Sequence, residues 1–236
     1  MKPRCPVPGW NLNTTGVLVA TKGGRGRSGD GSWTVNGHPE HLKRACEQSL
    51  KRLGVSAIGL YQLHKPDPAI PFAESVGAIR DLLDDGKIRM AGVSNTDASQ
   101  IRLANDILDG RLVAVQNEFS PAVRRNAPEL RLCAEMGIAF LPWSPLGGIS
   151  RSALDSRPRA AGPDPAHAAF HTIARHRSVS PQQVCLAWLL AISPTTVPIP
   201  GASRPDTIRD SAMAAVLTLS AEELALLSPQ PVPAAD

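Results

Sequence analysis

The chain has 236 residues, 42% of them hydrophobic, which is enough to bury one sizeable core and predicts a single domain over residues 1–236. The formal charge is +4, and because the basic residues are scattered rather than gathered in a block, nucleic acid is not expected as a partner. No stretch approaches 18 consecutive apolar residues, which argues against a membrane partner.

Four cysteines are spread along the chain without a Cys-x-x-Cys pair, at Cys5, Cys46, Cys133 and Cys185. Three of them lie in helix-like apolar contexts, which is typical of reduced core thiols rather than of a disulfide framework. The first residues lack the apolar core of a signal peptide. Together these features predict a cytoplasmic protein.

Short apolar runs alternate with longer amphipathic ones, the pattern of repeated βα units around a parallel sheet. Six strands are expected, at Val17 to Thr21, Ala57 to His64, Met90 to Ser94, Leu112 to Asn117, Ile138 to Trp143 and Thr196 to Ile199. The expected helices are Glu40 to Leu53, Phe72 to Asp85, Ala98 to Leu108, Ala127 to Met136, His167 to Arg175, Pro181 to Leu190 and Pro205 to Leu217. Gly54, Gly86, Gly110 and Gly137 follow four of these helices, where left-handed geometry costs a glycine little.

The α/β alternation is compatible with a doubly wound sheet or with a (β/α)8 barrel. No Gly-x-Gly-x-x-Gly joins the first strand to a helix, which disfavours the dinucleotide-binding version of the wound sheet. The glycine- and arginine-rich stretch Arg25 to Gly37 is interpreted as a flexible βα loop, and Ile149 to Pro165 as a second one. Residues 1–16 are expected to be irregular, and residues 228–236 to form a flexible tail.

Two polar side chains close apolar strands, Lys22 after the first and His64 after the second. In a βα barrel, functional groups project from the carboxyl ends of strands. Taken singly, a lysine at this place is more often a solvated charge, and a histidine more often a hydrogen-bonded structural residue. Their joint placement favours a site.

Six short motifs resemble those of the aldo-keto reductases and occur in that family's order between Val17 and Leu227. They are Val-Ala-Thr-Lys, Leu-Tyr-Gln-Leu-His, Gly-Val-Ser-Asn, Val-Gln-Asn-Glu-Phe-Ser, Trp-Ser-Pro-Leu-Gly and Ile-Pro-Gly-Ala. The resemblance implies a (β/α)8 barrel that reduces a small carbonyl substrate with NADP(H), NAD(H) being the alternative cofactor. It gives catalytic roles to Lys22 and His64, which would tune and orient the proton donor and the substrate carbonyl.

The same resemblance implies a set of cofactor-binding residues. Ser94, Asn95 and Gln116 would hold the nicotinamide carboxamide, although Ser94 and Asn95 are equally placed to cap a helix. Trp143 would stack on the nicotinamide ring, and the loop Ser144, Pro145, Leu146 and Gly147 would grip the pyrophosphate. The loop Pro200, Gly201, Ala202, Ser203 and Arg204 would bind the adenosine phosphate at a helix N-terminus. Asp210 and Ser211 stand where the family has Glu-Asn near adenine, which puts the NADP preference in doubt.

The larger departure from the family is at the start of the chain. The family's first two βα units, with its catalytic aspartate and tyrosine, have no counterpart before Val17, so an N-terminally truncated barrel of about six βα units is expected. The only tyrosine, Tyr61, lies three residues before His64 and therefore on the opposite face of its strand. His64, Lys22 and Asp67 are the other candidate proton donors.

Three further expectations follow from this pattern. Unpaired edge strands would favour instability or self-association. A catalytically silent nicotinamide-binding or protein-binding relative, or a truncated gene remnant, is the alternative function. No metal site is expected, because His167, His171 and His176 have no cysteine or carboxylate that completes a ligand set.

Overall fold

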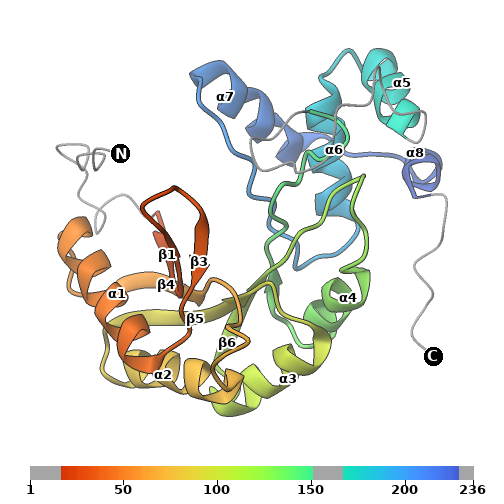
Figure 1. Cartoon of the computed structure of the whole chain (residues 1–236). Coiled ribbons are helices and arrows are strands. Elements are labelled where there is room, and N and C mark those ends of the chain that lie inside the picture. Colours follow the sequence, from red (N-terminus) through yellow and green to blue (C-terminus); the bar gives the residue numbers. More distant parts are fainter. Residues whose placement is uncertain (1–16, 151–166, 229–236) are drawn as a thin grey trace. The chain divides into compact units, whose positions relative to one another are not determined.

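The computed structural model describes residues 17–150 and 167–228, drawn in colour in Figure 1. The expectations for residues 1–16, for most of the loop Ile149 to Pro165 and for the tail after Ser228 lie outside the described residues. The chain divides between Val115 and Gln116 into two compact units. A single domain over residues 1–236 stays a prediction.

The first unit is built on parallel strands, β1 (Ala20–Gly23), β4 (Ile58–Leu63), β5 (Ile88–Ser94) and β6 (Leu112–Gln116), hydrogen-bonded in that order. Its helices are α1 (Pro39–Leu53), α2 (Phe72–Asp84) and α3 (Ala98–Ile107). Figure 1 shows α1 and α2 side by side against this sheet. The core is aliphatic, with Ile58, Leu63 and Val93 of the strands and Leu42 and Ile79 of the helices almost inaccessible to solvent.

Local sequence signals explain how these helices begin and end. Pro39 opens α1, and Gly54 closes it with φ 66°, in the left-handed region that glycine tolerates. Asp97 caps α3, because its side chain accepts the Gln100 N–H while the Gln100 side chain accepts the Asp97 N–H. The expected helices of this unit are therefore confirmed to within one or two residues.

The stretch Arg25 to Gly37 is not a flexible loop, and that prediction is wrong. Strands β2 (Arg25–Arg27) and β3 (Trp33–Val35) form an antiparallel hairpin, with Arg27 opposite Trp33. Both guanidinium groups of the first strand lie over the Trp33 ring, which favours the paired geometry. The many glycines obscured this pairing, because composition alone does not record which side chains stack.

The second unit contains α4 (Ala127–Glu135), β7 (Ala139–Phe140), α5 (Ala168–Arg177), α6 (Pro181–Ala191), α7 (Pro205–Met213), the 3-10 turn η2 (Ala214–Val216) and α8 (Ala221–Leu227). Its core surrounds Trp188 of α6, which stacks on Phe119 at 6.0 Å between ring centroids and meets the edge of Phe170 at 5.7 Å. Helix α8 was not expected from the sequence.

Two strand predictions in this unit need correction. The expected strand Ile138 to Trp143 is reduced to Ala139–Phe140, and the expected strand Thr196 to Ile199 is absent from the described structure. A single bridge joins Thr196 to Phe140. Pro198 and Pro200 lack the N–H that a longer ladder would need, so the pairing stops there.

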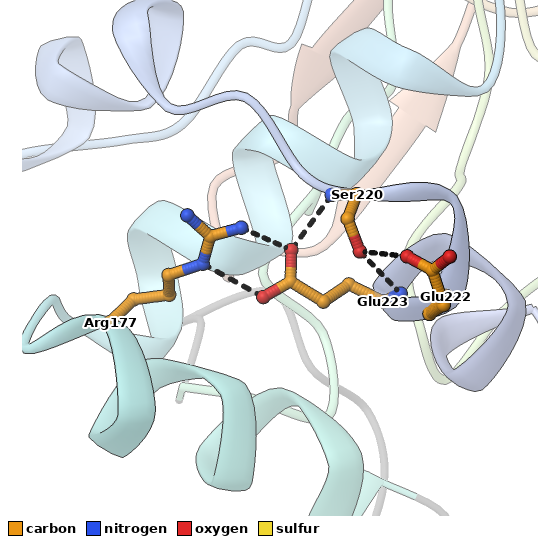
Figure 2. A network of polar contacts seen from close by, with 4 residues as sticks. All are labelled: Arg177, Ser220, Glu222 and Glu223. Carbon is orange, nitrogen blue, oxygen red and sulfur yellow. Dashed lines mark hydrogen bonds and ion pairs between the residues drawn. The ribbon is translucent and has the colours of Figure 1, made fainter.

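A polar network joins α8 to the end of α5 (Figure 2). Both carboxylate oxygens of Glu223 accept hydrogen bonds from Arg177, at 2.8 and 2.7 Å. Glu223 also accepts the Ser220 N–H, while the Ser220 hydroxyl accepts the Glu223 N–H and so completes a capping box. These contacts lower the pKa of Glu223 to about 2, first through Arg177 and then through Ser220.

We predict that Glu223→Gln destabilises the protein in a pH-dependent way. The folded-state pKa of Glu223 is lower than its ordinary value, so its stabilisation is complete above about pH 5 and is lost as the pH falls toward 2. The difference in urea midpoint between wild type and Glu223→Gln, followed by circular dichroism, should shrink over that range.

A matched variant separates the charge from the cap. Ser220→Ala removes the N-cap hydroxyl without changing a charge and should cost about 1 kcal/mol in the free energy of unfolding. Its pH dependence should be smaller than that of Glu223→Gln, because it leaves the Arg177 ion pair intact and removes only the hydroxyl hydrogen bond that lowers the pKa of Glu222. A difference between wild type and Glu223→Gln that stays constant from pH 7 to pH 3 would contradict the role given to the ion pair.

Candidate functional site

Lys22 and His64 come together at the carboxyl ends of adjacent parallel strands. Lys22 of β1 lies opposite Gln62 of β4, and His64 follows β4 directly. The backbone N–H of His64 donates to the carbonyl oxygen of Gly23 at 2.8 Å, which extends the pairing by one residue. The register therefore places both side chains in one neighbourhood, close enough for the charge of Lys22 to lower the pKa of His64.

Burial and positive neighbours set the charge state of this pair. Burial lowers the pKa of Lys22 below its ordinary value. The pKa of His64 falls to about 4, mainly through burial, with smaller effects from Lys22 and Arg25. At neutral pH the imidazole is therefore uncharged, with one nitrogen that donates a hydrogen bond and one that accepts.

The hairpin adds residues to this neighbourhood that the sequence analysis did not select. The Trp33 ring meets the His64 ring edge-on, with 6.5 Å between centroids. The guanidinium carbon of Arg25 lies 4.4 Å from the Trp33 ring centroid, and that of Arg27 lies 3.8 Å from it. The available signal was the short runs Arg-Gly-Arg and Trp-Thr-Val on either side of a Ser-Gly-Asp-Gly-Ser turn.

Two of the candidate proton donors are committed elsewhere. The Tyr61 side chain is fully buried and its hydroxyl donates to the Leu42 carbonyl oxygen at 3.2 Å, on the α1 side of the strand. Burial raises its pKa above the ordinary range of a phenol. The Asp67 carboxylate accepts N–H groups of Gly37 and Ala69, which lower its pKa. Neither group is placed to deliver a proton beside His64.

Asn95 supports the position of His64 rather than capping a helix. It follows β5 with φ 58°, and its side-chain amide donates to the carbonyl oxygen of His64 at 2.9 Å and to the Ser94 hydroxyl at 3.0 Å. Ser94 is buried at the end of β5. Asp97 is the N-cap of the following helix, so Ser94 and Asn95 are not needed in that role.

In the second unit, Gln116 and Trp143 lie at a short parallel backbone pairing between residues 117–119 and Trp143. Gln116 is buried at the end of β6, and the Trp143 N–H donates to the Asn117 carbonyl oxygen at 3.0 Å. Trp143 bridges Glu118 and keeps part of its side chain exposed. A half-buried aromatic residue at the end of a strand pairing is suited to stacking on a planar ring.

The turn after Trp143 has features that fit a polar ligand. Ser144 adopts φ 49°, and its buried hydroxyl oxygen has no hydrogen-bond partner among the described residues. The Gly147 N–H closes the turn on the Ser144 carbonyl oxygen at 3.0 Å. A side chain at Gly147 would meet the Ser120 hydroxyl at 2.7 Å, so the close approach requires glycine. Pro145 is buried and Leu146 is half-buried within the same turn.

The loop Pro200 to Arg204 leads directly into α7. Gly201, Ala202, Ser203 and Arg204 are exposed, and Arg204 is the N-cap residue of α7 without a capping side-chain bond. A Cβ at Gly201 would meet nothing within 4 Å, so the backbone is open to a ligand. Free N–H groups at such a helix start attract phosphate.

Asp210 and Ser211 lie on α7, with a different environment from the loop. The Asp210 carboxylate accepts the Ser180 hydroxyl at 2.7 Å and the Gln183 side-chain amide at 2.6 Å. Ser211 is buried. Asp210 thus ties α7 to the start of α6, and both of its oxygens are engaged.

The residues present fit a nicotinamide dinucleotide in part. The unpartnered Ser144 hydroxyl, the glycine-lined turn and the open loop before α7 are suited to polar and phosphate groups. Asp210 does not offer a free carboxylate to an adenine.

No group of three or more metal-ligating side chains gathers among residues 17–150 and 167–228. Over the same residues, no helix is both long and apolar enough to span a membrane.

Comparison with known proteins decides the family. A model of the aldo/keto reductase family matches residues 10–228. The chain belongs to this family. An uncharacterized oxidoreductase of Schizosaccharomyces pombe is 34% identical over 90% of this chain and 65% of its own length. A probable aldo-keto reductase of Glycine max is 33% identical over 88% of this chain and 65% of its own length.

A solved aldo/keto reductase of Klebsiella pneumoniae, in complex with NADP and acetate, matches with TM-score 0.68 and 28% identity. That match covers 82% of this chain and 65% of the other. Solved structures of other aldo-keto reductases match this chain and confirm the expected α/β barrel fold class. The chain spans about 65% of the length of these curated relatives.

We predict that His64 titrates far below an ordinary histidine. Its Cε1–H proton signal, identified by its loss in His64→Ala, should shift with a midpoint near pH 4. Lys22→Met should raise that midpoint, because a neighbouring positive charge disfavours imidazolium, but not to 6.5, because burial is the larger cause. Lys51→Met, which changes an exposed lysine of α1, is the control. A wild-type midpoint near 6.5 would contradict this account.

Proposed function

We propose that this aldo/keto reductase binds NADP(H) and reduces an aldehyde or ketone group of a small substrate to an alcohol. The observation that carries the proposal is the pairing of Lys22 and His64 at the carboxyl ends of β1 and β4. The NADP complex of the Klebsiella pneumoniae relative supports the choice of cofactor. The buried free thiols of Cys46, Cys133 and Cys185 support a reducing, cytoplasmic compartment.

The two catalytic candidates divide the work at the carbonyl oxygen. A bound reduced nicotinamide supplies the hydride that reaches the carbonyl carbon. Neutral His64 donates an N–H hydrogen bond to the carbonyl oxygen, where negative charge develops. Lys22 stabilises that charge and, because burial lowers its pKa, is a better proton donor than an exposed lysine. The proton passes to the new alcohol oxygen, and solvent water reprotonates Lys22.

The cofactor residues have complementary tasks in this proposal. Ser94, Asn95 and Gln116 would hold the nicotinamide carboxamide, and Trp143 would stack on the ring. The turn Ser144 to Gly147 would bind the pyrophosphate, with the unpartnered Ser144 hydroxyl as a donor. The loop Pro200 to Arg204 would bind the adenosine phosphate, where Arg204 would select NADP(H) over NAD(H). Asp210 and Ser211 would lie near the adenine. The Asp210 carboxylate would not bind it directly, because both of its oxygens accept hydrogen bonds from Ser180 and Gln183.

A second candidate function is a nicotinamide-binding protein without turnover. The observation that favours it is the hydrogen bond from Tyr61, the only tyrosine in the sequence, to the Leu42 carbonyl oxygen. A phenol held there has no part in proton transfer beside His64. The distinction is experimental, because binding and turnover are measured separately. Self-association through β1, at one edge of the sheet, stays a further prediction.

Loss of either catalytic candidate should slow turnover strongly while leaving cofactor binding in place. NADPH oxidation with 4-nitrobenzaldehyde should fall by about 10²- to 10⁴-fold in Lys22→Met, the range for loss of a positioned acid. In His64→Ala it should fall by about 10²- to 10³-fold, the range for loss of one hydrogen bond to the developing oxyanion. NADPH affinity, followed by quenching of tryptophan fluorescence, should change little in both variants. Lys51→Met should match wild type in both assays.

Two results would reject parts of this proposal. Wild-type binding of NADPH without turnover of any aldehyde or ketone would favour the silent relative. Turnover that survives in both Lys22→Met and His64→Ala would remove the roles given to those residues.

A further inference from the structure

Positive charge gathers around His64 without a matching carboxylate. We call Lys22, Arg25, Arg27, Trp33 and His64 the cationic corner; all five belong to the first unit. Among the described residues, no ion pair joins Lys22, Arg25 or Arg27 to an acidic side chain. Two guanidinium groups share the Trp33 ring, and like charges this close favour an anion between or beside them.

Arg25 has hydrogen-bonding capacity that the fold does not use. Its guanidinium stacks over Trp33, and stacking occupies the face of the group but leaves its N–H donors free in the plane. Its Nε atom is buried and has no partner among the described residues. A buried donor of this kind costs free energy unless a ligand or water satisfies it.

Arg27 differs from Arg25 although it stacks on the same ring. It is exposed, and one of its terminal nitrogens donates to the Gly31 carbonyl oxygen at 2.7 Å, within the hairpin turn. It has no buried unsatisfied donor. Arg27 therefore stabilises the hairpin and provides a matched comparison for Arg25.

The hairpin is held at both ends, which limits how far Arg25 can move. At its start, Gly24 has φ 92°, and its carbonyl oxygen accepts the Asn36 N–H at 3.0 Å. At its end, the Gly37 N–H donates to Asp67 at 2.8 Å, and the Ser75 hydroxyl donates to the Gly37 carbonyl oxygen at 2.7 Å. Arg25 is thus pre-organised, which reduces the entropy lost on binding.

We propose that Arg25 binds a carboxylate carried by the carbonyl substrate, so that the preferred substrates are acidic aldehydes or oxo acids. The guanidinium edge matches a carboxylate in a two-bond fork, and the Trp33 ring offers an apolar wall for the carbon skeleton. The carbonyl chemistry in this inference rests on the proposed function. The carboxylate site itself rests only on the geometry of the hairpin.

The position of Arg25 favours a substrate carboxylate over a cofactor phosphate. Arg25 lies close enough to His64 to lower its pKa, and His64 is the group expected at the substrate carbonyl. An anion bound at Arg25 would therefore lie beside His64, which fits the molecule that presents its carbonyl to His64.

Equilibrium binding tests the carboxylate site without requiring turnover. The probes are 4-formylbenzoate and its methyl ester, which differ in charge but share the aldehyde and the ring. The indole N–H signal of Trp33, identified by its loss in Trp33→Phe, reports binding by NMR. Wild type should bind the acid about 10- to 100-fold more tightly than the ester, the range for a hydrogen bond to a charged group.

Variants of the two hairpin arginines make the test specific. Arg25→Gln should remove the preference for the acid, and Arg25→Lys, which keeps the charge but loses the fork, should retain only part of it. Arg27→Gln should keep most of the preference, because it removes a nearby charge but not the fork of Arg25, and circular dichroism of each variant confirms its fold. Equal affinity for acid and ester in wild type, or a preference that survives Arg25→Gln, overturns the inference.

Steady-state kinetics with NADPH separates this inference from the proposed function. A preference for the acid in binding, with no NADPH oxidation for either aldehyde, rejects the carbonyl reductase but supports the carboxylate site. Turnover of both aldehydes with equal kcat/KM in wild type and in Arg25→Gln supports the reductase and rejects the carboxylate site.

Discussion

The contact between Gly23 and Tyr61 fixes the arrangement on which the site depends. A Cβ at Gly23 would come within 2.1 Å of the Tyr61 hydroxyl oxygen, so only glycine lets β1 lie against β4 at this point. Once the strands pair in this register, the His64 N–H reaches the Gly23 carbonyl oxygen, and Lys22 lies beside His64. The same geometry turns Tyr61 toward Leu42 and away from the catalytic candidates. The close approach of Gly23 to Tyr61 thus explains why Lys22 and His64 lie together and why the Tyr61 hydroxyl points away from them.

Burial and charged groups next to the paired strands set the protonation state of His64. The two residues after Gly23 begin the hairpin that brings Arg25 over Trp33, and Trp33 meets the edge of His64. Burial and two positive neighbours keep His64 neutral, which makes it a hydrogen-bond donor rather than a charged acid at neutral pH. A positive environment around a neutral imidazole favours a substrate that brings its own negative charge.

Much of the fold could be predicted from the sequence, because its signals are local. Gly54, Gly86, Gly110 and Gly137 all adopt the positive φ that their places after helices suggested. The placement of Lys22 and His64 also followed from strand ends and family motifs. The hairpin was missed because its pairing depends on arginines stacking on Trp33, which no periodicity reveals. The expected strand Thr196 to Ile199 failed because apolar alternation carried more weight than its prolines, which cannot donate to a ladder.

The most direct test of the central claim is the transfer of deuterium from NADPH labelled at one of the two C4 positions of the nicotinamide. A nicotinamide held in one orientation presents a single face to the carbonyl. The account predicts that wild type transfers deuterium to the alcohol from only one of the two labelled cofactors, as measured by mass spectrometry of the product. Transfer from both cofactors or from neither would contradict it.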